Sequence, residues 1–116
     1  MLIHKFQDEY ISDIFKKSDK FDYYYLSLNK HITSNIFLNN INKKWNYFIM
    51  SEHSIITWDI ISNNPNNPWK WYGISQNPNI TWDIIVNNPD KPWDWNAISE
   101  NSNITWKIIE DNPDKP

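Results

Sequence analysis

The chain has 116 residues, a formal net charge of −3 at pH 7, eight Trp, seven Pro and no Cys. This length allows one domain or one short repeat array, and the lack of Cys excludes disulfides, thiolate zinc sites and a thiol nucleophile. Arg is absent and the Lys residues are scattered, so the basic patch of a nucleic-acid-binding protein is missing and we expect no nucleic-acid partner.

Apolar runs are far shorter than the ~20 residues of a membrane-spanning helix. The first ten residues also lack the apolar stretch of a secretory signal. We therefore expect a protein that is neither exported nor embedded in a membrane.

Ile, Asn, Lys, Tyr and Phe make up about half of the chain, whereas Gly and Ala occur once each. The abundant residues have A/T-rich codons, so an AT-rich genome explains this bias without a functional cause. Trp and Pro have comparatively G/C-rich codons, and their retention indicates selection. An aromatic fraction of 16% argues against disorder and predicts a folded chain.

The sequence repeats every 24 residues without a gap. The unit reads approximately ITWDIIxNNPDKPWxWxxISxNxN, and its Ile-Thr-Trp start occurs at residues 56–58, 80–82 and 104–106. A fixed period of about 20 to 50 residues indicates a stacked array of structural units.

The repeats define the expected domain organisation. We expect residues 21–116 to form the array, with degenerate units over 21–55 and regular units over 56–116. Residues 1–20 fit the pattern poorly and are predicted to form an N-terminal capping segment.

The first half of each unit predicts a short helix. In the unit that begins at Ile80, Thr81 or Asn79 is placed to cap a helix over 82–87. Asn88 is expected to end it, because Asn tolerates the left-handed conformation and the following proline cannot continue a helix.

The second half predicts another helix over 93–99, with Pro92 in its first turn. Helices this short do not persist alone in water, so they must pack against neighbouring units. The predicted fold is all-α, a short α-solenoid of about four 24-residue helical hairpins.

A β-solenoid or a leucine-rich-repeat-like coil is the alternative fold, because Ile, Thr, Trp and Val also favour strands. Apolar pairs at helical spacing, such as Trp95 with Ile98, favour helices instead. The near absence of glycine argues the same way, since tight strand turns usually need positive φ.

The segments NPNITWDIIVNNPDKPWDWNAISENSNITW and ITWDIISNNPNNPWKWYGIS resemble the Trp/Asn/Pro-rich short tandem repeats of mimivirus-type giant DNA viruses. The resemblance covers residues 56–116 closely and 21–55 moderately. It implies a viral protein in the host-cell cytoplasm or the virion, and no catalytic residues. The chain departs from the pattern at Ser34, Ile41 and Lys44, so its N-terminal half should pack less regularly.

The recurring Trp residues are predicted to form the core rather than a sugar-binding platform, because each column would bury the same anchor in every unit. The predicted repeat core consists of Trp45, Trp58, Trp69, Trp71, Trp82, Trp93, Trp95 and Trp106.

No catalytic, cofactor or metal site is predicted. One serine recurs near the end of each second helix, and we expect its hydroxyl to bond a nearby backbone carbonyl or the following turn. His31 and His53 fall in different columns, and the carboxylates occupy repeated surface and capping positions. Asn79 and Asn103 match the N-glycosylation pattern, and we expect both to be unmodified.

Some exposed columns vary between units while the frame stays constant, as in arrays that display a binding face. The predicted interaction surface consists of Asp59, Lys70, Asp83, Asp94 and Lys107.

We therefore expect a non-enzymatic protein–protein interaction module with an unknown protein partner. If the protein is viral, this partner is expected to be a host protein. One alternative is a self-assembling structural protein, because the last predicted helix has apolar side chains with no second helix after them before Pro116. That C-terminal end would then pair with another copy. The other alternative is a glycan-binding module that uses surface Trp.

Overall fold

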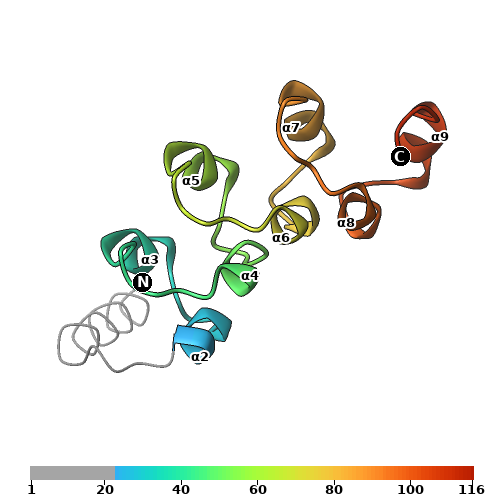
Figure 1. The fold of residues 1–116 in the computed structure, drawn as a ribbon. Coiled ribbons are helices and arrows are strands. Elements are labelled where there is room, and N and C mark those ends of the chain that lie inside the picture. The colour runs from blue at the N-terminus through green and yellow to red at the C-terminus, as the bar shows by residue number, and fades with distance from the viewer. Residues whose placement is uncertain (1–22) are drawn as a thin grey trace. The chain divides into compact units, whose positions relative to one another are not determined.

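The computed structural model describes residues 23–116, so the predicted capping segment 1–20 lies outside the described residues. The chain divides into two compact units, Met1–Asn46 and Tyr47–Pro116. The helices (Figure 1) are α2 (Tyr23–Leu28), α3 (Ser34–Asn39), α4 (Tyr47–Met50), α5 (Trp58–Asn63), α6 (Trp71–Gln76), α7 (Trp82–Asn87), α8 (Trp95–Glu100) and α9 (Trp106–Asp111).

The described residues contain only helices, turns and loops, so the all-α prediction is confirmed for residues 23–116. The β-solenoid and the leucine-rich-repeat-like coil are wrong for this part, because both need strands and no residue in it is assigned to one.

A threonine N-cap precedes each of α3, α5, α7 and α9. Its Oγ1 accepts the backbone N–H three residues further on at 3.2–3.3 Å. This bond satisfies a donor that the first helical turn leaves free. Thr81, and not Asn79, is therefore the cap of α7.

An asparagine C-cap ends each of the same four helices. Its side-chain Nδ2 donates to the carbonyl four residues earlier at 2.7–2.8 Å. The φ of Asn88 is −132°, and no residue from 23 to 116 has a positive φ. The expected left-handed conformation is wrong, because the amide satisfies the helix end while the backbone stays in an ordinary region.

The second helices begin later than the sequence predicts. Helix α8 begins at Trp95, after an N-cap at Asp94 whose Oδ1 accepts the Ala97 N–H at 3.1 Å. The predicted helix over 93–99 is therefore wrong at its start, and Pro92 lies in the loop rather than in the first turn.

The Trp before each second helix is held in the loop by its indole. Trp93 Nε1 donates to the Asn88 carbonyl at 2.8 Å. Trp45 and Trp69 make the same bond to the carbonyl five residues earlier at 2.9 Å. This bond satisfies the one polar atom of a side chain that is otherwise buried.

In residues 47–116, α4, α6 and α8 lie in one row and α5, α7 and α9 in another (Figure 1). Helix α6 packs on both α4 and α8. Gly73 permits the approach to α4, because a Cβ there would lie only 2.8 Å from the Ser51 Cβ. The core of this unit contains Tyr47, Met50, Ile56, Ile60, Ile61, Trp69, Ile74, Ile80, Ile85, Trp93, Ala97 and Ile98.

The eight Trp residues differ in burial. The loop residues Trp45, Trp69 and Trp93 are 5%, 9% and 8% exposed. Trp106 is 71% exposed and departs from the expected core placement. Trp58, the equivalent residue of α5, is covered by the Trp71 ring of α6 and by the Trp93 ring of the loop before α8. No ring of the described residues takes either place beside Trp106. The remaining four, Trp58, Trp71, Trp82 and Trp95, are half-buried.

The contrast between Trp93 and Trp106 predicts different costs of truncation. We expect Trp93→Ala to lower the free energy of unfolding by about 3–5 kcal/mol, since it leaves a cavity where a buried ring packs against Trp58 and Trp71. Trp106→Ala should change it by no more than about 0.5 kcal/mol. Urea unfolding followed by far-UV circular dichroism measures both, and equal losses would contradict the assigned burial.

Candidate functional site

The recurring serine joins each second helix to the next repeat. Its Oγ accepts the backbone N–H found 19 residues later, at 2.8–3.0 Å. The sequence predicted only a hydrogen bond to a nearby backbone group. Ser27 makes such a bond as well, because its hydroxyl donates to the Tyr23 carbonyl. The longer bonds join Ser27 to Asn46, Ser51 to Lys70 and Ser75 to Asp94, and all three serines are fully buried.

A column of buried asparagines adds a second link between repeats. Asn77 Nδ2 donates to the carbonyls of Ser51 and His53 at 2.9 and 3.1 Å. Asn101 Nδ2 donates to the Ser75 carbonyl at 2.9 Å. These bonds fix the distance between consecutive second helices, because a buried amide must find partners.

A third link uses the asparagine two positions further on. Asn79 Nδ2 donates to the carbonyls of Ser54 and Ile56, both at 2.8 Å. Asn103 makes the equivalent pair of bonds one repeat later. A glycan on either Nδ2 would remove a donor that the fold uses, which supports the prediction that both residues are unmodified.

His53 replaces asparagine in the Asn77 column and takes over one of its bonds. Its Nδ1 accepts the Ile55 N–H at 3.2 Å, as Asn77 Oδ1 accepts the Asn79 N–H at 2.8 Å. The His53 imidazole therefore stabilises a turn of the backbone. No cluster of three or more His, Asp or Glu residues suited to a metal ion occurs among residues 23–116.

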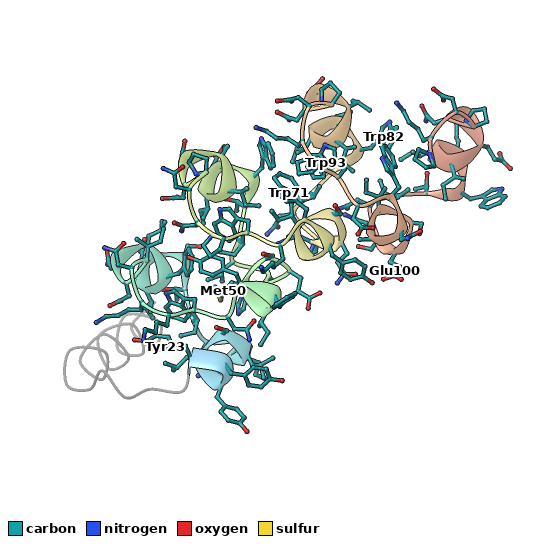
Figure 2. The ribbon with its side chains drawn as sticks, in the orientation of Figure 1. Tyr23, Met50, Trp71, Trp82, Trp93 and Glu100 are labelled. Atoms are coloured by element: carbon teal, nitrogen blue, oxygen red, sulfur yellow. The ribbon has the colours of Figure 1, made fainter. Side chains whose placement is uncertain are left out.

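Aromatic rings also pack from one repeat to the next. Tyr47 meets Trp69 edge-to-face with 5.1 Å between centroids, and Trp71 meets Trp93 at 5.2 Å (Figure 2). Trp58 adds a contact with Trp93 at 5.6 Å. Such pairs contribute about 0.5–1.5 kcal/mol each beyond the area that they bury.

The residues of the predicted interaction surface fall into two groups. Asp59, Asp83 and Lys107 are exposed at one position of α5, α7 and α9. Lys70 and Asp94 are instead the N-caps of α6 and α8, and their backbone N–H groups bond the buried serines. The Asp94 carboxylate caps its helix, and the Lys70 ammonium lies 4.9 Å from the centroid of a phenylalanine ring.

Two grooves lie at equivalent places in successive repeats of the second unit. Their volumes are about 350 Å³ and about 150 Å³. Ser62 lines the larger groove and Val86, in the same repeat column, lines the smaller one. The grooves were not predicted from the sequence, because they lie between segments one full repeat apart.

Two tyrosines of this unit have raised pKa values. Burial raises the pKa of the Tyr47 phenol, which also accepts the Asn67 Nδ2 at 3.0 Å. The Glu100 carboxylate raises the pKa of the exposed Tyr72, mainly through a 3.1 Å hydrogen bond from the Tyr72 hydroxyl. Tyr72 and Glu100 are both exposed, so surface pairing explains the first cause of that shift, and burial explains the shift of Tyr47.

The described residues define an all-α, Trp-rich protein built from repeated short helices. Comparison with known proteins found no match among protein-family models, curated proteins or solved structures. None of the helices in the described part of the chain combines the length and apolar character that crossing a membrane requires.

The serine link can be tested within one column. Ser75→Ala leaves the part-buried Asp94 N–H without its acceptor, and we expect the free energy of unfolding to fall by about 1–3 kcal/mol. Ser99 occupies the same column but is exposed, so Ser99→Ala should cost no more than about 0.5 kcal/mol. Urea titration of both variants checks this, and the link is refuted if Ser75→Ala is as harmless as Ser99→Ala.

The raised pKa of Tyr47 predicts a pH effect. The folded state keeps this phenol protonated to higher pH than the unfolded chain does, so stability should fall as pH rises above about 10. In Tyr47→Phe, this decrease between pH 8 and about pH 11 should be smaller than in the wild type. Tyr25→Phe, which removes a phenol on a side chain that is 69% exposed, is the control in denaturation measurements at both pH values.

Proposed function

We propose that this chain is a non-enzymatic protein–protein interaction module, a short α-solenoid that binds its partner along the first helices of its repeats. One observation carries the proposal. Asp59, Asp83 and Lys107 occupy one exposed column, and their side chains make no bond from one repeat to the next among residues 47–116. The constant Ser and Asn columns are by contrast engaged in hydrogen bonds between repeats, and the Trp93 ring packs on Trp71 of the preceding repeat.

The placement of this column suits a partner that lies along the array. Helices α5, α7 and α9 form one row (Figure 1), so each repeat adds one side chain to the same face. Ser62 and Val86 lie three residues after Asp59 and Asp83, on the same helix face, and line the two grooves. A partner can therefore contact a charge in each repeat and insert side chains between repeats.

We also propose a viral origin, with the host-cell cytoplasm or the virion as the setting and a host protein as the partner. The support is the resemblance of the repeats to those of mimivirus-type viruses, together with the AT-rich codon bias.

An affinity purification with two matched variants tests the binding face. The full chain is the bait in lysate of a host cell of such viruses, and retained proteins are identified by mass spectrometry. We expect a stoichiometric partner that is lost from the variant carrying Asp59→Ala, Asp83→Ala and Lys107→Ala, because these changes remove the charges without touching a bond between repeats.

The control variant carries Asn66→Ala, Asn96→Ala and Asp114→Ala, three exposed residues that line neither groove. It should retain the partner, and circular dichroism should show both variants folded. Loss of the partner from both variants, or no stoichiometric partner with the wild type, would refute this face.

Two alternatives stay predictions. A glycan-binding module would have one largely exposed indole for stacking, that of Trp106. A self-assembling structural protein would use the uncovered apolar side chains of α9, where Trp106 and Ile109 are 71% and 42% exposed.

A further inference from the structure

Two aromatic residues occupy one column of the second helices in residues 47–116. Phe48 lies on α4 and Tyr72 on α6, and their side chains are 70% and 48% exposed. Helix α6 packs on both α4 and α8, so Tyr72 has a neighbouring helix on either side. The two rings therefore allow one surface position to be compared in consecutive repeats.

The Phe48 ring already has a cation over it. The Lys70 ammonium lies 4.9 Å from the centroid of this ring. Lys70 is the N-cap of α6, so the cation comes from the repeat after the one that contains Phe48. A ring face attracts an ammonium or a guanidinium within about 6 Å of its centroid. This surface position of the repeat therefore suits a positively charged group.

One repeat later, at Tyr72, an acid replaces that lysine. Asp94 occupies the column of Lys70, and its side chain turns back to accept the Ala97 N–H at 3.1 Å. Among residues 23–116, the lysines that lie over aromatic rings are Lys70, over Phe48, and Lys115, over Trp95. No lysine of this part of the chain therefore lies over the Tyr72 ring.

Carboxylates surround the Tyr72 ring instead. The Tyr72 hydroxyl donates to Glu100 Oε2 at 3.1 Å, and Glu100, which is labelled in Figure 2, is exposed at the end of α8. The pKa of Tyr72 is raised first by this hydrogen bond and further by the negative charges of Glu100, Asp94 and Glu52. An ionised carboxylate has about four lone-pair sites, so Glu100 can accept further hydrogen bonds.

We infer that the Tyr72 ring and the Glu100 carboxylate form a binding site for an arginine side chain of a partner protein. The guanidinium stacks on the ring and donates to the carboxylate. Charge complementarity supports this occupant, because the position that holds a lysine over Phe48 is here flanked by acids.

Arginine fits this site better than lysine does. Its planar guanidinium can stack on an aromatic ring while its N–H groups donate to a carboxylate, whereas an ammonium is a compact and strongly hydrated charge. The 116 residues contain no Arg, so none of them can supply this group.

This inference goes beyond the proposed function, because Tyr72 and Glu100 lie on α6 and α8 and the proposed face lies on α5, α7 and α9. The two surfaces can therefore fail separately. The variant that carries Ala at positions 59, 83 and 107 should bind arginine as the wild type does. Loss of arginine binding from that variant would assign the arginine to the other face and overturn the inference.

The probe is the peptide acetyl-Gly-Gly-Arg-Gly-Gly-amide, added to the ¹⁵N-labelled full chain and followed by NMR at physiological ionic strength. We expect saturable shifts of backbone amides in α6 and α8, that of Tyr72 included. The matched peptide has citrulline, an uncharged analogue, in place of arginine. It should bind about 5-fold more weakly or less tightly still, because it loses the attraction to both the ring and the carboxylate. Equal binding of both peptides, or saturable shifts that exclude Tyr72, would overturn the inference.

Variants of the protein test the ring. Tyr72→Leu should weaken arginine binding by about 2- to 5-fold, the loss expected for a cation–ring contact at an exposed site. Tyr72→Phe keeps the ring and should retain binding. The inference fails if Tyr72→Leu binds as the wild type does, or if Tyr72→Phe binds as weakly as Tyr72→Leu.

A second pair of variants tests the carboxylate. Glu100→Gln should weaken arginine binding by about 2- to 5-fold, the loss expected for an exposed ion pair. Glu110→Gln removes the same charge from an exposed position of α9 and should bind as the wild type does. Circular dichroism checks that all variants are folded. Equal binding by Glu100→Gln and Glu110→Gln would overturn the inference.

Discussion

The buried hydrogen bond from a backbone N–H to the serine of the preceding repeat is the constraint on which the fold depends. The helices have four to six residues, too few to persist alone in water. Their stability must come from neighbours, and packing a neighbour buries the N–H at the start of the second helix. A serine is small enough to stay inside and supplies the acceptor. The tryptophan just before this N–H then packs in a single register against the preceding repeat, as Trp93 does.

This constraint explains why a variable column is not always a binding face. Lys70 and Asp94 differ in chemistry, yet both satisfy the fold, because the serine bond uses only their backbone N–H. The serine bond makes no demand on the side chain at this column, although the Asp94 carboxylate also caps α8. Asp59 and Asp83 lie where no hydrogen bond of backbone or side chain joins repeats, which is why we propose their column as the binding face.

What the sequence could predict is local. Helix, threonine cap and helix end follow from residues within a few positions of one another, and these features are present. Helix α8 starts later than predicted, because the Asp94 side chain folds back to cap it. The φ of Asn88 is not left-handed, because the Asn88 side chain folds back onto the helix end. The partner of Ser75 was not predicted, because it lies 19 residues away. The cavity lined by Trp82, Trp95 and Ile108 was not predicted either, since its walls lie on α7, α8 and α9. The predicted burial of Trp106 was wrong for a related reason. A column of the repeat specifies the residue type, but it does not specify which side chains surround that residue.

Asparagine shows how composition and structure act together. The A/T-rich codon bias expected from the sequence would account for the abundance of asparagine, but it would not account for the positions that asparagine occupies. Asn77 Nδ2 donates to two carbonyls of the preceding repeat while its Oδ1 accepts the Asn79 N–H. Aspartate has no such donor and serine is too short to serve both sides, so an amide is the side chain that closes this junction. Whatever makes asparagine abundant, the backbone groups between repeats must be satisfied, and the amide does this at these positions.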